Sequence, residues 1–300
     1  MPFEGEPFHV KGTWKRLERN FEHMSILSAI FLGIVQGIAE FLPISSSGHL
    51  AIAQNLFGIK LEGSADGTFD ILLHLGTLVA VFVAYWPDIV DMIREFFFGI
   101  RDLAKKSTPH PMPPNRRMIL LLILGTLPLF FIVPFKDAIA SLSSNMIAVG
   151  CALLITGVLL FFSDRHNRGT KDASDVRFRD ILVIGLAQAV ATVPGISRSG
   201  TTVSVGCFLG LDRRFALRYS FLMSIPAILG ANILNLKDCI ETGVDPALIP
   251  AYISGMVTAA ILGYLSIRLL KIVTEKGKFG AFAYYCWAVG ALTIILNFVL

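Results

Sequence analysis

Two stretches of the chain are copies of each other: Gly33-Ile-Val-Gln36-Gly-Ile-Ala-Glu40-Phe-Leu-Pro43-Ile-Ser45-Ser46-Ser47-Gly48-His49 and Gly185-Leu-Ala-Gln188-Ala-Val-Ala-Thr192-Val-Pro194-Gly195-Ile-Ser197-Arg198-Ser199-Gly200-Thr201. The second copy begins 152 positions after the first. Without a gap, identical residues meet at Gly33, Gln36, Ala39, Ile44, Ser45, Ser47 and Gly48. Chance would seldom produce this agreement, so the chain is predicted to consist of two related halves.

The composition predicts that lipid surrounds most of the chain. Hydrophobic residues make up 54% of it, only 16% are charged and the mean hydropathy is +0.67, which is not the profile of an ordinary soluble domain. About 20 apolar residues cross a bilayer core of about 30 Å, and such runs lie at 118–135, 138–163, 219–236, 246–267 and 279–300. A sixth run, 71–86, follows Asp70 and contains His74. It spans only if those two polar groups face protein or an interface.

Each copy is followed by three apolar runs, and an odd number of crossings turns the second copy upside down. Inverted repeats of this kind place a site near the bilayer midplane, between the copies. Each copy also contains a helix breaker, Pro43 in one and Pro194-Gly195 in the other. The arm 199–211 would be about 20 Å long as a helix, too short to cross the core. We therefore predict re-entrant helix-loop-helix hairpins at 24–58 and 180–211.

The predicted fold is an all-α integral membrane protein with an inverted-topology repeat, six transmembrane helices and the two re-entrant hairpins. Residues 1–24 form an N-terminal tail. Residues 25–300 form a single membrane domain, built of the repeats 25–163 and 178–300.

The distribution of basic residues agrees with this topology. The predicted topology puts four segments on one side of the membrane: 94–117, 165–179, 213–218 and 268–278. These segments hold 18 of the 26 basic residues. Basic residues gather on the cytoplasmic side of membrane proteins, so both termini are predicted to face outward. The four basic residues of the tail do not fit. A first hairpin that crossed the membrane once would accommodate them, but the two hairpins would then no longer be equivalent.

Arg198 stands at the tip of the second hairpin with apolar sequence on both sides. An unpaired cation inside a bilayer is costly, so it needs an anion. The anion can be Glu40, in a buried pair that merely locks the hairpins together, or it can be a ligand. A guanidinium grips phosphate oxygens through two parallel hydrogen bonds, so we favour a phosphate-bearing ligand.

Hydroxyl side chains open the second arm of both hairpins. They are Ser45, Ser46 and Ser47 in the first hairpin, and Ser197, Ser199, Thr201 and Thr202 in the second. Any one of them alone is best explained as a helix N-cap. Two clusters at equivalent positions, with an arginine between them, favour an anion site, because helix N-termini offer free N–H groups and positive dipole ends.

Glu40 and His49 complete the candidate site. Ser46 and His49 are three residues apart, so they share a helix face on which the imidazole could take the hydroxyl proton. Gln36 lies one turn before Glu40 on the preceding arm. The alternative for His49 is a hydrogen-bonded core residue. For His74, a structural pair with Asp70 is at least as good an explanation as a role in the site.

These residues resemble the motifs of one known family. The segment 36–40 matches (Glu/Gln)-x-x-x-Glu, and the segment 194–202 matches Pro-Gly-x-Ser-Arg-Ser-x-x-Thr, of the undecaprenyl-diphosphate phosphatase family, also called the bacitracin-resistance family. The segment 41–49 is similar to its first hairpin tip. The resemblance runs from about residue 25 to the C-terminus.

The resemblance implies hydrolysis of undecaprenyl diphosphate at the outer face of the plasma (inner) membrane, which recycles the lipid carrier for peptidoglycan synthesis and gives bacitracin resistance. It implies that Glu40, His49 and Arg198 are essential and that Ser46, or a water in its place, is the nucleophile. Around the phosphates it places Gln36, Ser45, Ser47, Ser197, Ser199 and Thr202. Because residue 36 is Gln, a scheme with two ionised carboxylates on that helix cannot apply here.

Further expectations concern cofactors and partners. The family resemblance implies a response to a divalent cation such as Mg²⁺ or Ca²⁺, but the tips carry too few carboxylates for a dedicated metal site. The expected partners are undecaprenyl diphosphate and the lipid bilayer, with no nucleic acid. Small residues from Gly150 to Gly157 favour close helix packing, either within one subunit or in a homodimer.

Two other functions compete with this one. Inverted repeats with broken helices are also typical of secondary transporters and lipid flippases, which would bind the same phosphate but release none. Membrane lipid phosphatases with a phosphohistidine intermediate need a His at position 204, where this chain has Ser204. The sequence therefore excludes that class.

Overall fold

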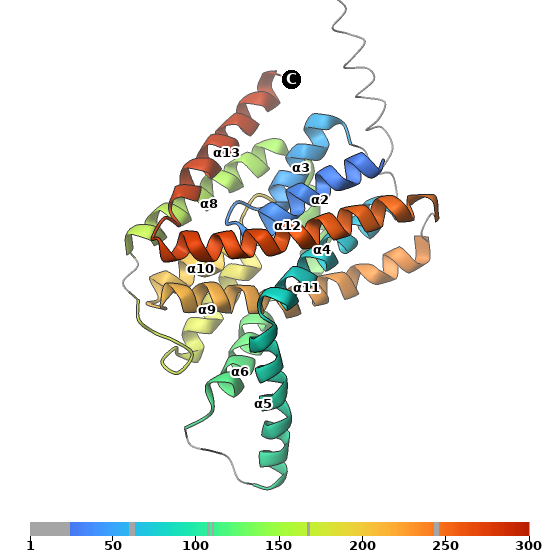
Figure 1. Ribbon diagram of the computed structural model, residues 1–300. Helices are drawn as coiled ribbons and strands as arrows, with labels where there is room; N and C mark the ends of the chain where they lie inside the picture. The colour runs from blue at the N-terminus through green and yellow to red at the C-terminus, as the bar shows by residue number, and fades with distance from the viewer. Residues whose placement is uncertain are drawn as a thin grey trace, which may run out of the picture.

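The computed structural model describes residues 25–59, 64–106, 109, 111–166, 169–242 and 246–299. Nearly all of these residues are helical (Figure 1), and the only β-type pairing among them is an isolated bridge between Lys171 and Leu211. The all-α prediction is therefore confirmed. The predicted tail 1–24 lies outside the described residues.

The described elements follow one another along the chain as α2 Ile26–Phe41, α3 Ser46–Phe57, α4 Ser64–Ala84, α5 Trp86–Ala104, α6 Pro114–Thr126, η1 Leu127–Phe131, η2 Val133–Phe135, α7 Lys136–Ala140, η3 Ser141–Ser144, α8 Met146–His166, α9 Phe178–Val190, α10 Arg198–Phe208, α11 Arg213–Thr242, η4 Pro246–Leu248, α12 Ile249–Glu275 and α13 Ala281–Val299. The η elements are short 3-10 helices. In Figure 1, α5 and α6 project below the rest of the molecule.

Six stretches among the described residues are long and apolar enough to cross a membrane, and they match the six predicted runs. They are Gly67–Ala84, Pro114–Phe131, Met146–His166, Arg213–Asn235, Pro246–Glu275 and Ala281–Val299. The second stretch is not a single α-helix: α6 ends at Thr126 and the chain continues as 3-10 turns. Pro128 explains the change, because it has no N–H to donate to the preceding turn.

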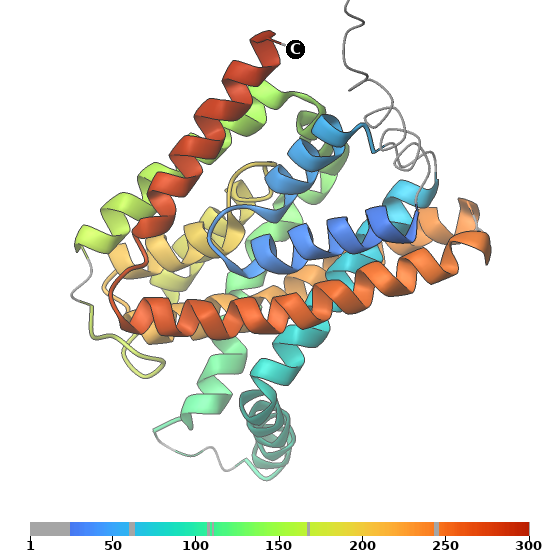
Figure 2. The ribbon, with the colours of Figure 1, turned by 45° about the horizontal axis from the view of Figure 1, so that its top comes forward.

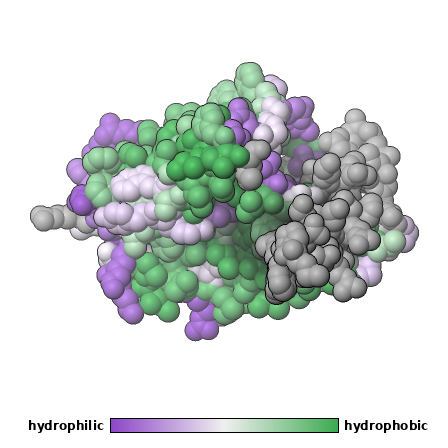
Figure 3. Space-filling model, turned by 90° about the horizontal axis from the view of Figure 1, so that it is seen from above, coloured by the Kyte–Doolittle hydropathy of each residue, from purple (hydrophilic) through white to green (hydrophobic). Residues whose placement is uncertain are grey.

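The surface of the molecule is itself apolar. Phe130, Phe131 and Phe298 expose 69%, 75% and 75% of their area, and Figure 3 shows broad areas of hydrophobic residues on the face seen from above. Apolar surface of this extent is stable against lipid and not against water. The chain is thus a multi-pass membrane protein.

Both repeated segments fold as a helix, a loop and a second short helix. The first is α2 and α3, joined around Pro43, and the second is α9 and α10, joined by a loop in which Gly195 has φ +95°. That left-handed conformation suits glycine, which has no side chain to clash. At 11 residues, α10 is about 17 Å long.

The first arm of each hairpin packs backbone to backbone on a helix from the other half of the chain. A Cβ placed on Gly33 of α2 would lie 2.5 Å from the carbonyl oxygen of Gly255 in α12. A Cβ placed on Gly185, the residue equivalent to Gly33, would lie 2.5 Å from the carbonyl oxygen of Gly125 in α6. Only glycine allows so close an approach, so these contacts fix where the arms lie.

The two hairpin tips meet inside the molecule. In Figure 2 the blue loop after α2 and the yellow loop before α10 lie near each other. A Cβ on Gly48 would stand 2.9 Å from Cα of Gly195, and one on Gly200 would stand 3.2 Å from Cβ of Pro43. Residues about 150 positions apart are therefore held in direct contact.

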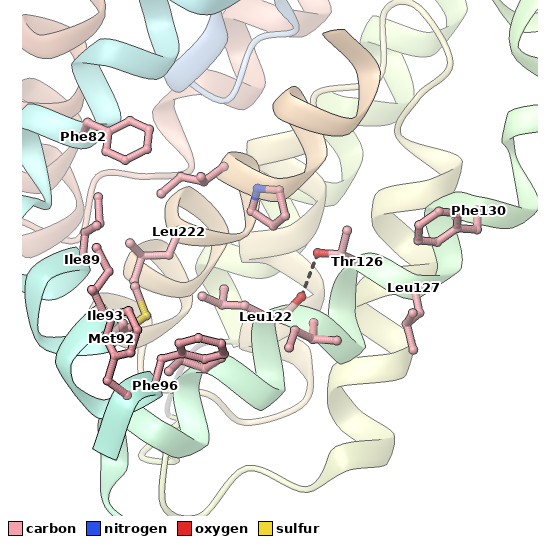
Figure 4. A pocket seen from close by; sticks show the side chains of 15 residues that line it. Phe82, Ile89, Met92, Ile93, Phe96, Leu122, Thr126, Leu127, Phe130 and Leu222 are labelled. Carbon is pink, nitrogen blue, oxygen red and sulfur yellow. Dashed lines mark hydrogen bonds between the residues drawn. The ribbon is translucent and has the colours of Figure 1, made fainter. Parts of the chain in front are cut away.

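A groove of about 570 Å³ lies between α4, α5, α6 and α11. Its lining is apolar apart from Thr126 (Figure 4), whose hydroxyl donates to the carbonyl of Leu122 at 2.7 Å. The residues that line this groove therefore offer no acid, base or nucleophile for a reaction. The chemically capable residues gather at the hairpin tips instead.

Candidate active site at the hairpin tips

An ion pair joins the two tips. Arg198, the first residue of α10, donates through Nη2 to Oε1 of Glu40, in the last turn of α2. The side chains are 17% and 5% exposed. The pair that the sequence offered as one alternative for Arg198 is therefore formed. However, Nη1 of the same guanidinium is buried without any hydrogen-bond partner. Arg198 could therefore donate a hydrogen bond from Nη1 to a ligand.

The second oxygen of Glu40 accepts hydrogen bonds from two side chains of the first hairpin. Ser46 donates its hydroxyl to Oε2 at 2.6 Å, and Gln36 donates its amide to the same atom at 3.1 Å. The Nε2 atom of His74, on α4, stands 3.9 Å from Oε2. Glu40 is thus placed where a carboxylate could accept the proton of Ser46, as a general base does.

His49 does not contact Ser46 in the arrangement the sequence suggested. Its Nδ1 lies 2.8 Å from the carbonyl oxygen of Ser45, and its Nε2 lies 2.9 Å from the hydroxyl of Tyr285. A carbonyl oxygen only accepts, so Nδ1 carries the proton and Nε2 accepts from Tyr285. With both nitrogens hydrogen-bonded, the imidazole of His49 links the start of α3 to Tyr285. The hydroxyl of Ser46 donates to Glu40 and not to His49.

Tyr285 is a site residue that the sequence did not reveal. It lies on α13 and stacks on His49, with ring centroids 5.6 Å apart and an angle of 11° between the planes. The two residues are 236 positions apart, and Tyr285 stands in an apolar run without a motif. No signal in a single sequence marks such a contact.

The predicted phosphate-binding hydroxyls divide into two groups. Ser45 and Ser197 are N-caps, since their Oγ atoms accept from the amides of Gly48 at 3.3 Å and Gly200 at 3.1 Å. The simple explanation as caps is therefore confirmed for these two. The second group is Ser47 and Ser199, each of which lies within hydrogen-bond distance of a cap. The hydroxyl of Ser47 is 3.4 Å from that of Ser45, and the hydroxyl of Ser199 is 3.2 Å from that of Ser197.

Thr202 is buried one turn into α10. Its hydroxyl bonds the carbonyl of Arg198 at 2.9 Å and the hydroxyl of Ser220 on α11 at 2.7 Å. Ser47, in contrast, is exposed. The structure therefore brings Glu40 into direct contact with both Ser46 and Arg198, at the capped N-termini of α3 and α10.

The comparisons with known proteins agree with this geometry. The model of the family described as bacitracin resistance protein BacA matches residues 29–292. The chain belongs to this family. It is 43% identical to an undecaprenyl-diphosphatase of Methanosphaera stadtmanae over 92% of this chain and 100% of the relative. It is 41% identical to one of Halothermothrix orenii, over 91% and 98% of the two chains, and 40% identical to one of Alkaliphilus metalliredigens, over 91% and 99%.

Membership of the BacA family confirms the resemblance drawn from the two motifs. The roles of individual residues stay predictions. They rest on the contacts described above and on the motif positions.

The described residues of this BacA family member do not fit a resident metal ion. Among them, no three His, Cys, Asp or Glu side chains form a group that could hold one. At the tips, the oxygens of Glu40 already accept from Arg198, Ser46 and Gln36. Mg²⁺ and Ca²⁺ need several free oxygen ligands, which this carboxylate does not offer.

Proposed function

We propose that this chain is a membrane phosphatase that hydrolyses undecaprenyl diphosphate to undecaprenyl phosphate and inorganic phosphate. In this role it recycles the lipid carrier for peptidoglycan synthesis and confers resistance to bacitracin. The observation that carries the proposal is the contact of Ser46, Glu40 and Arg198 at the meeting point of the two tips. It contains a nucleophile, a base and a cation with a free donor. Relatives over most of the chain are named undecaprenyl-diphosphatase.

In the proposed reaction, Ser46 attacks the terminal phosphorus while its hydroxyl proton passes to Oε2 of Glu40. The bond from that phosphorus to the bridging oxygen breaks, and undecaprenyl phosphate leaves with the bond's electron pair. Water then attacks the phosphoserine and the bond from phosphorus to the Ser46 oxygen breaks. That oxygen takes back the proton held by Glu40, and both protons of the water leave with the inorganic phosphate. The 2.6 Å bond from Ser46 to Glu40 favours the serine over a directly attacking water.

The other residues would stabilise charge. The free Nη1 of Arg198 and the amides at the starts of α3 and α10 would neutralise the phosphate oxygens, which is the main demand of phosphoryl transfer. Ser47 and Ser199 would donate to the same oxygens, while Ser45, Ser197 and Thr202 would hold the two helix starts in place. His49 would keep α3 oriented through Ser45 and Tyr285.

The inverted repeat and the re-entrant course of both hairpins belong to this proposal. In support, the second arms are too short to cross the bilayer core. The equivalent residues Gly33 and Gly185 each pack on a glycine of the opposite half, as a two-fold exchange of arms requires. The family resemblance suggests a plasma-membrane protein whose tips open to the periplasmic or extracellular side, and the distribution of basic residues favours outward-facing termini.

A divalent cation and a homodimer are further parts of the proposal. Because the protein offers few oxygen ligands, a Mg²⁺ or Ca²⁺ ion would arrive with the diphosphate rather than reside in the apoprotein. Gly150 and Gly157 of α8 already pack on α13, close to Gly290 and Trp287. A dimer would therefore have to use other faces than this small-residue stripe.

Phosphate release tests the function directly. The purified full chain, reconstituted in nanodiscs with undecaprenyl diphosphate, is assayed with and without a chelator, alongside Arg198→Ala and Arg94→Ala. Arg94 is a matched control because its side chain is 69% exposed. Wild type and Arg94→Ala should release phosphate and Arg198→Ala should nearly lose activity. Movement of the lipid across the membrane without phosphate release would instead identify a flippase.

A further inference from the structure

His74 lies beside the proposed base without a role in the reaction so far. It stands on α4, one turn after Asp70, and its side chain is 28% exposed. Its Nε2 points toward Oε2 of Glu40 at 3.9 Å. Its Nδ1 lies 2.9 Å from the carbonyl oxygen of Asp70 and 3.6 Å from the carboxylate of the same residue. The imidazole is therefore held between two carboxylates.

This geometry favours the charged form of His74. Because the Asp70 carbonyl can only accept, Nδ1 must carry a proton. In a neutral ring the lone pair of Nε2 would then face Oε2 of Glu40, and two electron-rich atoms would oppose each other. An imidazolium presents an N–H to each side instead, and carboxylates close to it favour that form.

A second cation matters because Arg198 has two tasks. In the described state one of its nitrogens pairs with Glu40, while the other is free for phosphate. A diphosphate bound at the free nitrogen would bring two or more negative charges to the same guanidinium, which would then offset less of the charge of Glu40. A buried carboxylate that loses its cation takes up a proton more readily, and a protonated Glu40 cannot accept the proton of Ser46.

We propose that His74 is a positioning residue that keeps Glu40 ionised while Arg198 engages the phosphate, and that Asp70 holds the imidazolium in place. The inference rests on the proposed function, since it assigns a partner to the base of that reaction. The charged groups that act on His74 are Asp70 on its own helix, Glu40 on α2 and Arg198 on α10. The first two attract the imidazolium and the third repels it.

The pH profile of kcat/KM separates this role from a structural one. In His74→Gln the amide still fits beside Glu40, but one positive charge is gone. Protonation of Glu40 then sets in at higher pH, so the acid limb of the profile should move up by about one pH unit. At the alkaline plateau, activity should stay within about threefold of wild type. The matched control is His166→Gln, on the exposed end of α8, which should leave the limb unmoved.

An acid limb that stays in place, or a loss of equal size at every pH, would overturn the inference. A second measurement does not depend on hydrolysis. In protein labelled at its histidines, the ring signal of His74, assigned by its absence in His74→Gln, is titrated in wild type and in Glu40→Gln. His74 should keep its proton to higher pH in wild type, and equal midpoints would refute the pairing. If wild type releases no phosphate, the proposed function fails and this titration still decides the pairing.

Discussion

The contact between the two tips makes Gly48→Ala the most informative single substitution. Gly48 lies in the first turn of α3, between Ser46 and the body of the helix. An added Cβ would stand 2.9 Å from Cα of Gly195, whereas ordinary van der Waals contact begins at 3.4 Å. The tips must therefore separate by about 0.5 Å. Neither side can yield cheaply, because the opposing atom belongs to the backbone of a loop that is itself packed on Val149.

The separation acts on the reaction, because Ser46 and Glu40 belong to one hairpin and Arg198 to the other. A misplacement of 1 Å can cost about a hundredfold in rate, so 0.5 Å is expected to lower kcat about tenfold, or about 1.4 kcal/mol. Alanine is also the better helix former, by about 1 kcal/mol relative to glycine. Melting temperature should therefore change less than activity does.

Phosphate release from undecaprenyl diphosphate in nanodiscs measures the effect, with Gly230→Ala as the control. Gly230 is a glycine of α11 around which a Cβ would meet nothing within 4 Å, so this variant should keep wild-type turnover. If Gly48→Ala is as active as Gly230→Ala, close contact of the tips is not what aligns the reacting groups. The geometric account of the site would then be wrong.

Three other substitutions test single contacts. Arg198→Lys keeps the charge but loses the planar fork that serves Glu40 and phosphate together, so kcat/KM should fall at least tenfold; near-normal kinetics would contradict the bidentate role. Ser46→Ala should lower turnover below a tenth of wild type, and a higher residual rate would favour attack by water. Tyr285→Phe keeps the stacked ring but removes a hydrogen bond worth about 1 kcal/mol. Its kcat should fall several-fold while Tyr284→Phe, an exposed neighbour, stays near wild type.

Much of this architecture could be predicted because it depends on local composition. Six long apolar runs could only be spanning helices in lipid, and Pro43 and Pro194-Gly195 mark the loops where the structure breaks its helices. The pairing of the tips also followed from the repeat, because equivalent segments that each carry polar groups must bury them together. Arg198 and Glu40 meet for that reason.

The contacts that the sequence could not supply are those made by tertiary packing. Spacing put Ser46 and His49 on one helix face, but Ser45 has φ +73° at the start of α3 and the two side chains turn to different partners. His49 turns to Tyr285, and Ser46 turns back to Glu40. Helical periodicity describes a regular helix, whereas this pair lies in the first turn after a sharply bent loop.

The remaining question is whether the pair of Arg198 and Glu40 only fastens the tips together. A buried ion pair is a weak source of stability, because desolvation offsets most of the attraction. A fastening pair would also be expected to satisfy its own polar atoms, since an unmet buried donor costs about 1–3 kcal/mol. Here Nη1 of Arg198 is buried and unmet, while Glu40 accepts from Ser46 as well as from the guanidinium. An unsatisfied donor beside a carboxylate that also binds a serine hydroxyl is an arrangement that a phosphate oxygen would complete, which favours our proposal of a phosphate-binding role for the pair over a purely structural one.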